Sequence, residues 1–73
     1  MNGPQEPYVL LAGADMYRLA RFRAARPDVL IGGGQFGTWQ ALIPEPRGET
    51  FVVRHTLAEL LGRLGELLGE PPR

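Results

Sequence analysis

The sequence predicts a small α+β domain with two layers, in which a helix, a three-stranded antiparallel sheet and a second helix follow one another and both helices cover one face of the sheet. Three observations favour this fold class. Apolar residues recur at helical spacing near both ends of the chain, the segment between them is rich in β-branched and aromatic residues, and glycine or proline separates the segments. With 73 residues we expect one domain over 8–69, between flexible tails at 1–7 and 70–73.

The first helix is expected at about residues 15–25. Asp15 is a candidate N-cap, and Pro27 prevents the helix from continuing. Three apolar residues then share one face at helical spacing, namely Met16, Leu19 and Phe22.

The strands are expected after this helix. The apolar run at 8–11 is a possible additional strand before it, because so short a run fits either a strand or a lead-in to a helix. A glycine turn at 32–34 and a polar connection at 44–48 divide the middle of the chain. The three expected strands cover residues 29–31, 36–43 and 50–54.

The second helix is expected to begin at residue 57, because Thr56 and Glu59 have the spacing of a capping box. Its leucines form a core-facing stripe at positions 57, 60, 61, 64, 67 and 68. Glycine costs a helix about 1 kcal/mol relative to alanine. A second stripe on this helix consists of small residues, namely Ala58, Gly62, Gly65 and Gly69. Because its glycines weaken the helix, these residues are either tolerated on an exposed face or used to dock another backbone.

Alternation along the middle strand places Trp39, Ala41 and Ile43 on the core face and leaves an apolar opposite face that no third layer covers. Phe36, Thr38, Gln40 and Leu42 belong to that opposite face, together with Leu30 or Ile31 and with Phe51 or Val52. The predicted core comprises Met16, Leu19, Phe22, Ile31, Trp39, Ile43, Val53, Leu57, Leu60, Leu61, Leu64 and Leu68.

Composition argues against catalysis. The chain has no cysteine and one histidine, His55, and no nucleophile, base and orienting group occur together. We therefore expect no enzyme activity, no cofactor and no metal. Eight arginines balance eight acidic residues, and neither a membrane span nor a signal peptide is recognisable, so a cytoplasmic location is expected.

Two motifs suggest ligands. Gly32, Gly34 and Gly37 match G-x-G-x-x-G, but a strand rather than a helix is expected to follow, so a hairpin turn is the better interpretation. The first helix is locally basic, which raises the alternative of a nucleic-acid-associated regulator that uses Arg18, Arg21, Arg23 and Arg26.

The order helix, three strands, helix resembles that of the double-stranded RNA-binding domain and its relatives. Where that family has a Lys-rich start to its last helix, this chain has residues 55–59, His-Thr-Leu-Ala-Glu, so the resemblance implies the fold rather than RNA contact. The segments 19–28, 37–41 and 56–61 also look like short uncharacterised proteins of actinobacteria, a likeness that implies no activity.

These observations together favour a small non-enzymatic protein-interaction or accessory module that self-associates as a homodimer or binds another protein. A basic first helix would instead favour nucleic acid as the partner. The residues expected to contact a protein partner lie on the uncovered sheet face and on the small-residue stripe, namely Phe36, Gln40, Leu42, Ala58, Gly62, Gly65 and Gly69.

Overall fold

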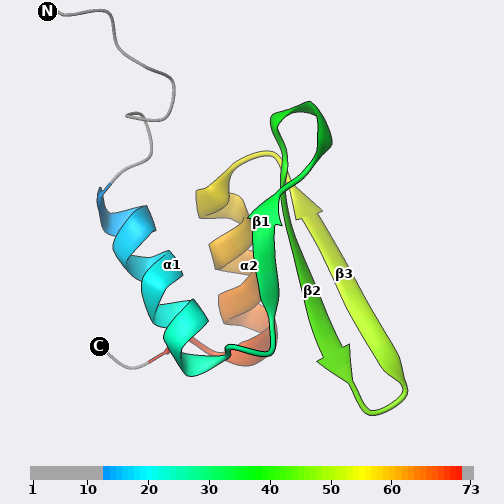
Figure 1. Ribbon diagram of the computed structural model, residues 1–73. Coiled ribbons are helices and arrows are strands. Elements are labelled where there is room, and N and C mark those ends of the chain that lie inside the picture. The colour runs from blue at the N-terminus through cyan, green and yellow to red at the C-terminus, as the bar shows by residue number, and fades with distance from the viewer. Residues whose placement is uncertain (1–12, 72–73) are drawn as a thin grey trace, which may run out of the picture.

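The computed structural model describes residues 13–71 and confirms the predicted α+β fold (Figure 1). The N-terminal tail, the possible strand at 8–11 and the last two residues lie outside the described part of the chain. In chain order the elements are α1 (Gly13–Ala25), β1 (Leu30–Gly33), a 3-10 turn η2 (Gln35–Gly37), β2 (Trp39–Glu45), β3 (Gly48–Arg54) and α2 (Leu57–Leu68).

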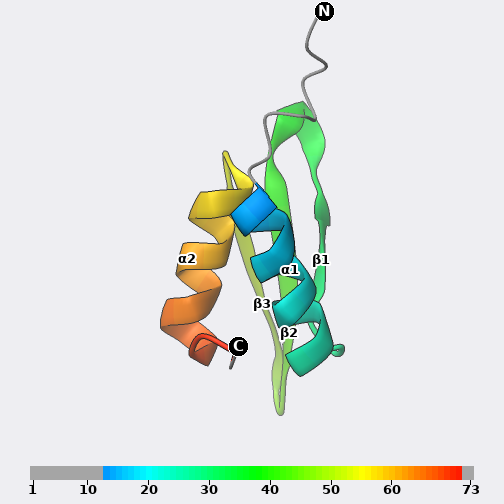
Figure 2. The ribbon, with the colours of Figure 1, turned by 90° about the vertical axis from the view of Figure 1, so that its left-hand side faces the viewer.

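The sheet is an antiparallel meander with the strand order β1-β2-β3. In the view of Figure 1, α2 crosses behind the sheet and α1 lies beside it, along the side of β1. The view turned by 90° shows α2 alongside the sheet with α1 next to it (Figure 2). Helix α1 packs mainly against α2, whereas α2 packs directly on β2 and β3. No helix among the described elements covers the opposite face of the sheet.

The core lies between the helices and the sheet, and α2 contributes most to it. The capping box that begins α2 is confirmed: the Glu59 N–H donates to Thr56 Oγ1 at 3.1 Å, and the Thr56 N–H donates to Glu59 Oε1 at 3.2 Å. Trp39 and Leu68 are partly buried against the core. The buried apolar residues are Leu19, Phe22, Val29, Ile31, Ala41, Ile43, Val52, Leu57, Leu60, Leu61 and Leu64.

The prediction that Met16 and Val53 belong to the core is wrong. Met16 is 45% exposed, because it lies in the first turn of α1, before the buried part of this helix, which begins at Leu19. Val53 is 39% exposed, whereas its neighbour Val52 is only 6% exposed. The register pairs Val52 with Ala41 on the core face, and alternation then turns Val53 outward. Val29 and Val52 are buried although the predicted core contains neither of them.

Several element boundaries differ from the predictions. Helix α1 begins at Gly13, so Asp15 lies in its first turn rather than at the N-cap. Gly32 and Gly33 belong to β1, and Phe36 belongs to the turn instead of the next strand.

Strand β2 continues through Pro44 to Glu45, although the sequence predicted that Pro44 would end it. Pro44 pairs with Glu49 in β3, but β1 ends opposite Leu42. The backbone N–H and C=O groups of even-numbered residues in β2 point toward β1. Because β1 does not extend beyond Leu42, no strand lies where an N–H at residue 44 would point, and proline loses no hydrogen bond there. The strand therefore tolerates proline at this position.

Candidate docking surface on the uncovered sheet face

The outer face of the sheet carries an apolar row that crosses all three strands. The register pairs Leu30 with Leu42 and Leu42 with Phe51, and residues directly opposite each other project to the same side. Leu30 is 64% exposed and Phe51 is 59% exposed, while the central Leu42 is half-buried between them. These three side chains are called the apolar row below. The alternatives left open by the sequence are thus settled as Leu30 and Phe51.

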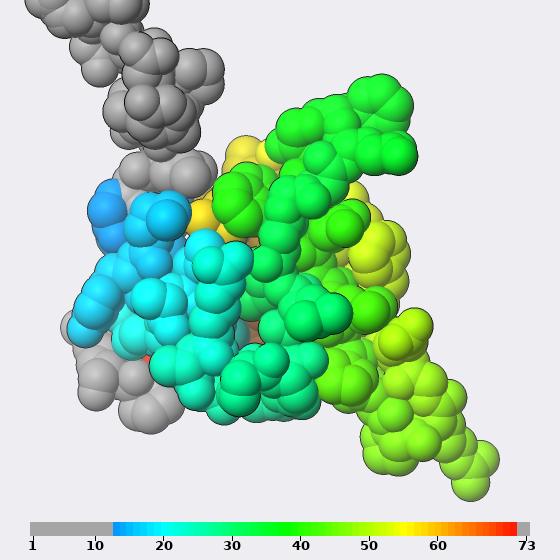
Figure 3. Space-filling model, in the orientation of Figure 1, coloured from blue at the N-terminus to red at the C-terminus, as the bar shows by residue number. Residues whose placement is uncertain are grey.

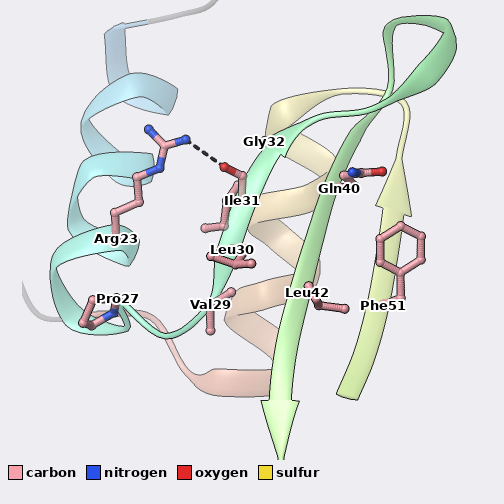
Figure 4. A pocket seen from close by; sticks show the side chains of 9 residues that line it. All are labelled: Arg23, Pro27, Val29, Leu30, Ile31, Gly32, Gln40, Leu42 and Phe51. Atoms are coloured by element: carbon pink, nitrogen blue, oxygen red, sulfur yellow. Dashed lines mark hydrogen bonds between the residues drawn. The ribbon is translucent and has the colours of Figure 1, made fainter. Parts of the chain in front are cut away.

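A second row lies nearer the β1–β2 turn and is more polar. It consists of Gly32, Gln40 and Val53, which are paired across the strands in the same way. Gly32 has no side chain, so the surface is hollowed here. A shallow open depression of about 550 Å³ lies over β1 and the apolar row (Figure 4). Pro27 and Arg23 from the α1 side border it.

The β1–β2 turn projects beyond the body of the domain and presents an aromatic ring. Phe36 is 97% exposed and adopts the left-handed conformation, with φ 58° and ψ 34°. A non-glycine residue in this region costs roughly 1 to 2 kcal/mol. The turn holds this geometry because the Gly34 N–H donates to the Thr38 carbonyl at 2.8 Å and the Thr38 hydroxyl donates to the Gln35 carbonyl at 2.6 Å.

Gly34 is the closely packed glycine of this turn. A Cβ atom there would lie 2.7 Å from Thr38 Oγ1 and 2.8 Å from Gln40 Oε1. Figure 3 shows the turn protruding above the rest of the sheet. The G-x-G-x-x-G match is therefore a hairpin turn: η2 is a single three-residue turn between two strands, and it supplies no helix N-terminus for a phosphate.

The two edges of the sheet are protected differently. On β1, the Ile31 carbonyl points away from β2 and accepts a hydrogen bond from Arg23 Nη2 of α1 at 2.8 Å. On β3, among the described residues, the only side chain that donates to an outward carbonyl is that of Arg54, which bonds the adjacent Val53 at the end of the strand, at 2.7 Å. No described element lies beyond β3 in Figure 1. The β3 edge is therefore the accessible one.

The residues of the small-residue stripe of α2 have different surroundings. Gly69 is the C-cap, with φ 83°, and its N–H donates to the Gly65 carbonyl at 2.9 Å. Gly65 lies beneath an ion pair between Arg18 and Glu70, and a Cβ atom at this position would collide with the Glu70 carboxylate. Ala58, Gly62 and Gly69 have no such cover, so this stripe is not one continuous open surface.

The contact over Gly65 joins α1 to the end of α2. Arg18 donates to both carboxylate oxygens of Glu70, and its Nη2 also donates to the Leu61 carbonyl at 3.2 Å. Hydrogen bonding from Arg18 lowers the pKa of the Glu70 carboxyl below its ordinary value. Residue 70, assigned to the C-terminal tail by sequence, thus fastens the two helices together.

Replacing Gly62 with alanine is expected to stabilise the domain by about 0.5 to 1 kcal/mol, because alanine has the higher helix propensity and nothing lies within 4 Å of the added Cβ atom. Gly65→Ala is the matched control: its Cβ displaces Glu70 and weakens the Arg18 contact, so the propensity gain is largely cancelled. Urea denaturation followed by circular dichroism measures both. Equal stabilisation by the two variants would contradict this role of Gly65.

Three of the four arginines proposed for nucleic acid donate hydrogen bonds within the domain, and the fourth, Arg21, lies over an aromatic ring while its buried Nε has no hydrogen-bond partner among the described residues. Arg18 binds Glu70, and Arg23 binds the β1 edge. Arg26 forms a two-bond ion pair with Asp28 at 2.9 and 3.0 Å, and this contact lowers the pKa of the Asp28 carboxyl. The Arg21 guanidinium stacks over the Tyr17 ring at 4.7 Å. These contacts tie the basic side chains of α1 to other parts of the domain.

Within residues 13–71, no group of three potential metal ligands lies close together. No helix in this range is long and apolar enough to cross a membrane.

No protein-family model matches the chain, and no curated protein or solved structure is significantly similar to it. The resemblances suggested by element order and by sequence texture therefore remain predictions. A functional assignment has to rest on the residues of the outer face and the β3 edge.

Proposed function

We propose that this protein is a non-enzymatic interaction module that self-associates through the surface made by its uncovered sheet. The observation that supports this most strongly is the apolar row of Leu30, Leu42 and Phe51 on a face that no element within residues 13–71 covers. Exposed apolar surface of this kind marks interaction sites on small proteins.

The neighbouring turn enlarges this surface. Phe36 is almost fully exposed at the tip, and a phenylalanine side chain offers about 200 Å² of contact area. The hydrogen bonds of the turn fix the backbone that carries Phe36, so binding need not order this loop. Together with Phe51 it supplies two aromatic anchors of the type that dominates binding energy at interfaces.

Size favours self-association as well. A domain of 73 residues buries only about 60% of the surface that its unfolded chain exposes, and covering more apolar surface by association stabilises it. The surface offers an open apolar depression with few polar groups at its margin, which suits another protein better than a small polar substrate.

Sedimentation equilibrium over a concentration series tests the proposal. We expect the wild-type protein to associate at micromolar concentrations, and Phe51→Ser to weaken association at least ten-fold, because Phe51 is the exposed aromatic side chain of the apolar row. Leu67→Ser is the matched control, since Leu67 is comparably apolar and also exposed but lies on α2. A strict monomer at several hundred micromolar would contradict self-association.

A further inference from the structure

We propose that the second copy joins at the free edge of β3, antiparallel and about a two-fold axis at Phe51, so that two three-stranded sheets form one six-stranded sheet. This inference rests on the proposed self-association and specifies its geometry. Both outer faces then lie on the same side of the combined sheet.

The backbone of β3 fixes which residues can bond a new strand. The Gly34–Thr38 hydrogen bond shows that even-numbered residues of β2 direct their backbone groups toward β1, so Trp39, Ala41 and Ile43 direct theirs toward β3. Their partners on β3 are the even-numbered residues of that strand. The outward N–H and C=O groups of β3 consequently belong to Glu49, Phe51 and Val53.

The length of β3 then selects one register. Its seven residues run from Gly48 to Arg54, and Phe51 is the central one. Only an axis at Phe51 pairs all seven residues of the strand with those of its copy. In this register Phe51 lies opposite Phe51 of the second copy, and Glu49 lies opposite Val53 at both ends. All three residues with outward backbone groups are then hydrogen-bonded. An axis at Glu49 would place two carboxylates opposite each other, which destabilises a pair of strands.

The side chains are compatible with this register. Phe51 meets its own copy on the outer face, and aromatic pairs are favourable across strands. The apolar row Leu30, Leu42, Phe51 continues into Phe51, Leu42 and Leu30 of the second copy, so a single apolar band crosses six strands. Gly48 lies opposite Arg54, where the missing side chain leaves space for the guanidinium.

The two sheet edges differ in the way this arrangement requires. Arg23 of α1 occupies the Ile31 carbonyl on the β1 edge, and β1 has only four residues. Strand β3 is longer and carries no proline, and its charged residues, Glu49 and Arg54, lie near its two ends rather than at its centre. The Val53 carbonyl on this edge accepts a hydrogen bond from the adjacent Arg54 side chain. This side chain can turn into solvent, and the carbonyl can then accept a hydrogen bond from the incoming strand.

The area involved indicates a weak dimer. Pairing along seven residues covers a strip about 23 Å long. Such a strip is smaller than the roughly 1,200 Å² at which standard specific interfaces begin, so a micromolar dissociation constant is expected. The main-chain hydrogen bonds supply affinity, and the Phe51 pair fixes the register.

Disulfide trapping tests the register, because the chain has no native cysteine. Residues facing each other in a bonded antiparallel pair have Cα atoms about 5.5 Å apart, within the range that a disulfide spans. Phe51→Cys is expected to form disulfide dimers at least ten-fold faster than Tyr17→Cys, an exposed position on α1 that reports random collision.

Glu49→Cys and Val53→Cys provide a second, matched measurement. Each alone places its two cysteines about 14 Å apart, four residues along the strand and one strand spacing across, and should cross-link no faster than Tyr17→Cys. An equimolar mixture of the two variants should cross-link as heterodimers at a rate comparable to Phe51→Cys. In denaturing urea these differences should disappear, which confirms that they depend on the folded dimer.

The possible failures are distinguishable. A wild-type monomer in sedimentation equilibrium would overturn both the proposed function and this inference. A wild-type dimer in which Leu42→Cys cross-links but Phe51→Cys does not would indicate packing of the outer faces, and would overturn the edge pairing while leaving self-association intact. Cross-linking of Phe51→Cys no faster than Tyr17→Cys in a dimeric protein would likewise overturn it.

Discussion

Val52→Asp is expected to unfold the domain, with a loss of about 4 kcal/mol or more in the free energy of unfolding. Val52 is buried and pairs with Ala41 on the core face, against which α2 packs. A carboxylate at this position would be removed from water without a partner, and this is among the most destabilising of single changes. The total stability expected for 73 residues is only about 4 to 11 kcal/mol, so little or no folded protein should remain.

Val53→Asp is the matched control for Val52→Asp, because it makes the same chemical change one residue along the strand. Val53 projects from the outer face, where a carboxylate stays hydrated, so a loss of less than about 1 kcal/mol is expected. Far-UV circular dichroism at 25 °C and urea denaturation distinguish the two variants. If Val53→Asp were the more destabilising, the register of β3 would have to shift by one residue.

Phe22→Ala is expected to lower the free energy of unfolding by about 3 to 5 kcal/mol. Phe22 is one of the largest fully buried side chains, and with Leu19 it carries the packing of α1. Truncation removes aromatic contacts and leaves a cavity between α1 and the rest of the core. The same change removes the aromatic ring whose centroid lies 5.9 Å from the Arg18 guanidinium carbon. Chemical denaturation of both proteins measures the difference.

Met16→Ala serves as the comparison on the same helix. Sequence periodicity places Met16 and Phe22 together in the core, whereas the structure leaves Met16 nearly half exposed. We expect Met16→Ala to cost less than about 1 kcal/mol, since only part of its side chain contacts other residues. Equal losses from the two substitutions would mean that the first turn of α1 packs more closely than described.

The fold could be predicted because its main signals are local. The capping box at Thr56 and Glu59 fixes where α2 begins, and the leucine spacing fixes which side of it is buried. Alternation along β2 identified Trp39, Ala41 and Ile43 as the core face for the same reason. On β3 three apolar residues follow one another, so alternation alone could not choose between Val52 and Val53. Only pairing with β2 decides it.

The candidate site was less predictable because it depends on contacts between distant segments. The outer-face positions of Gln40 and Leu42 follow from strand periodicity. Nothing local in the sequence indicates that Arg18 and Glu70 close over Gly65, or that Arg23 reaches the β1 edge. The left-handed conformation of Phe36 also escaped prediction, since such backbones usually carry glycine or asparagine. Gly37 beside it was the available signal for a tight turn.

The meander order of the strands also determines how the chain can fold. Every strand pairs with its neighbour in sequence, and α2 packs on the hairpin that immediately precedes it. These short-range contacts form with little loop-closure entropy, which favours rapid folding. Docking of α1 is different: its contact with Glu70 joins residues 52 positions apart. Helix α1 is therefore the segment expected to dock last and to detach first, and amide exchange should be faster there than in α2.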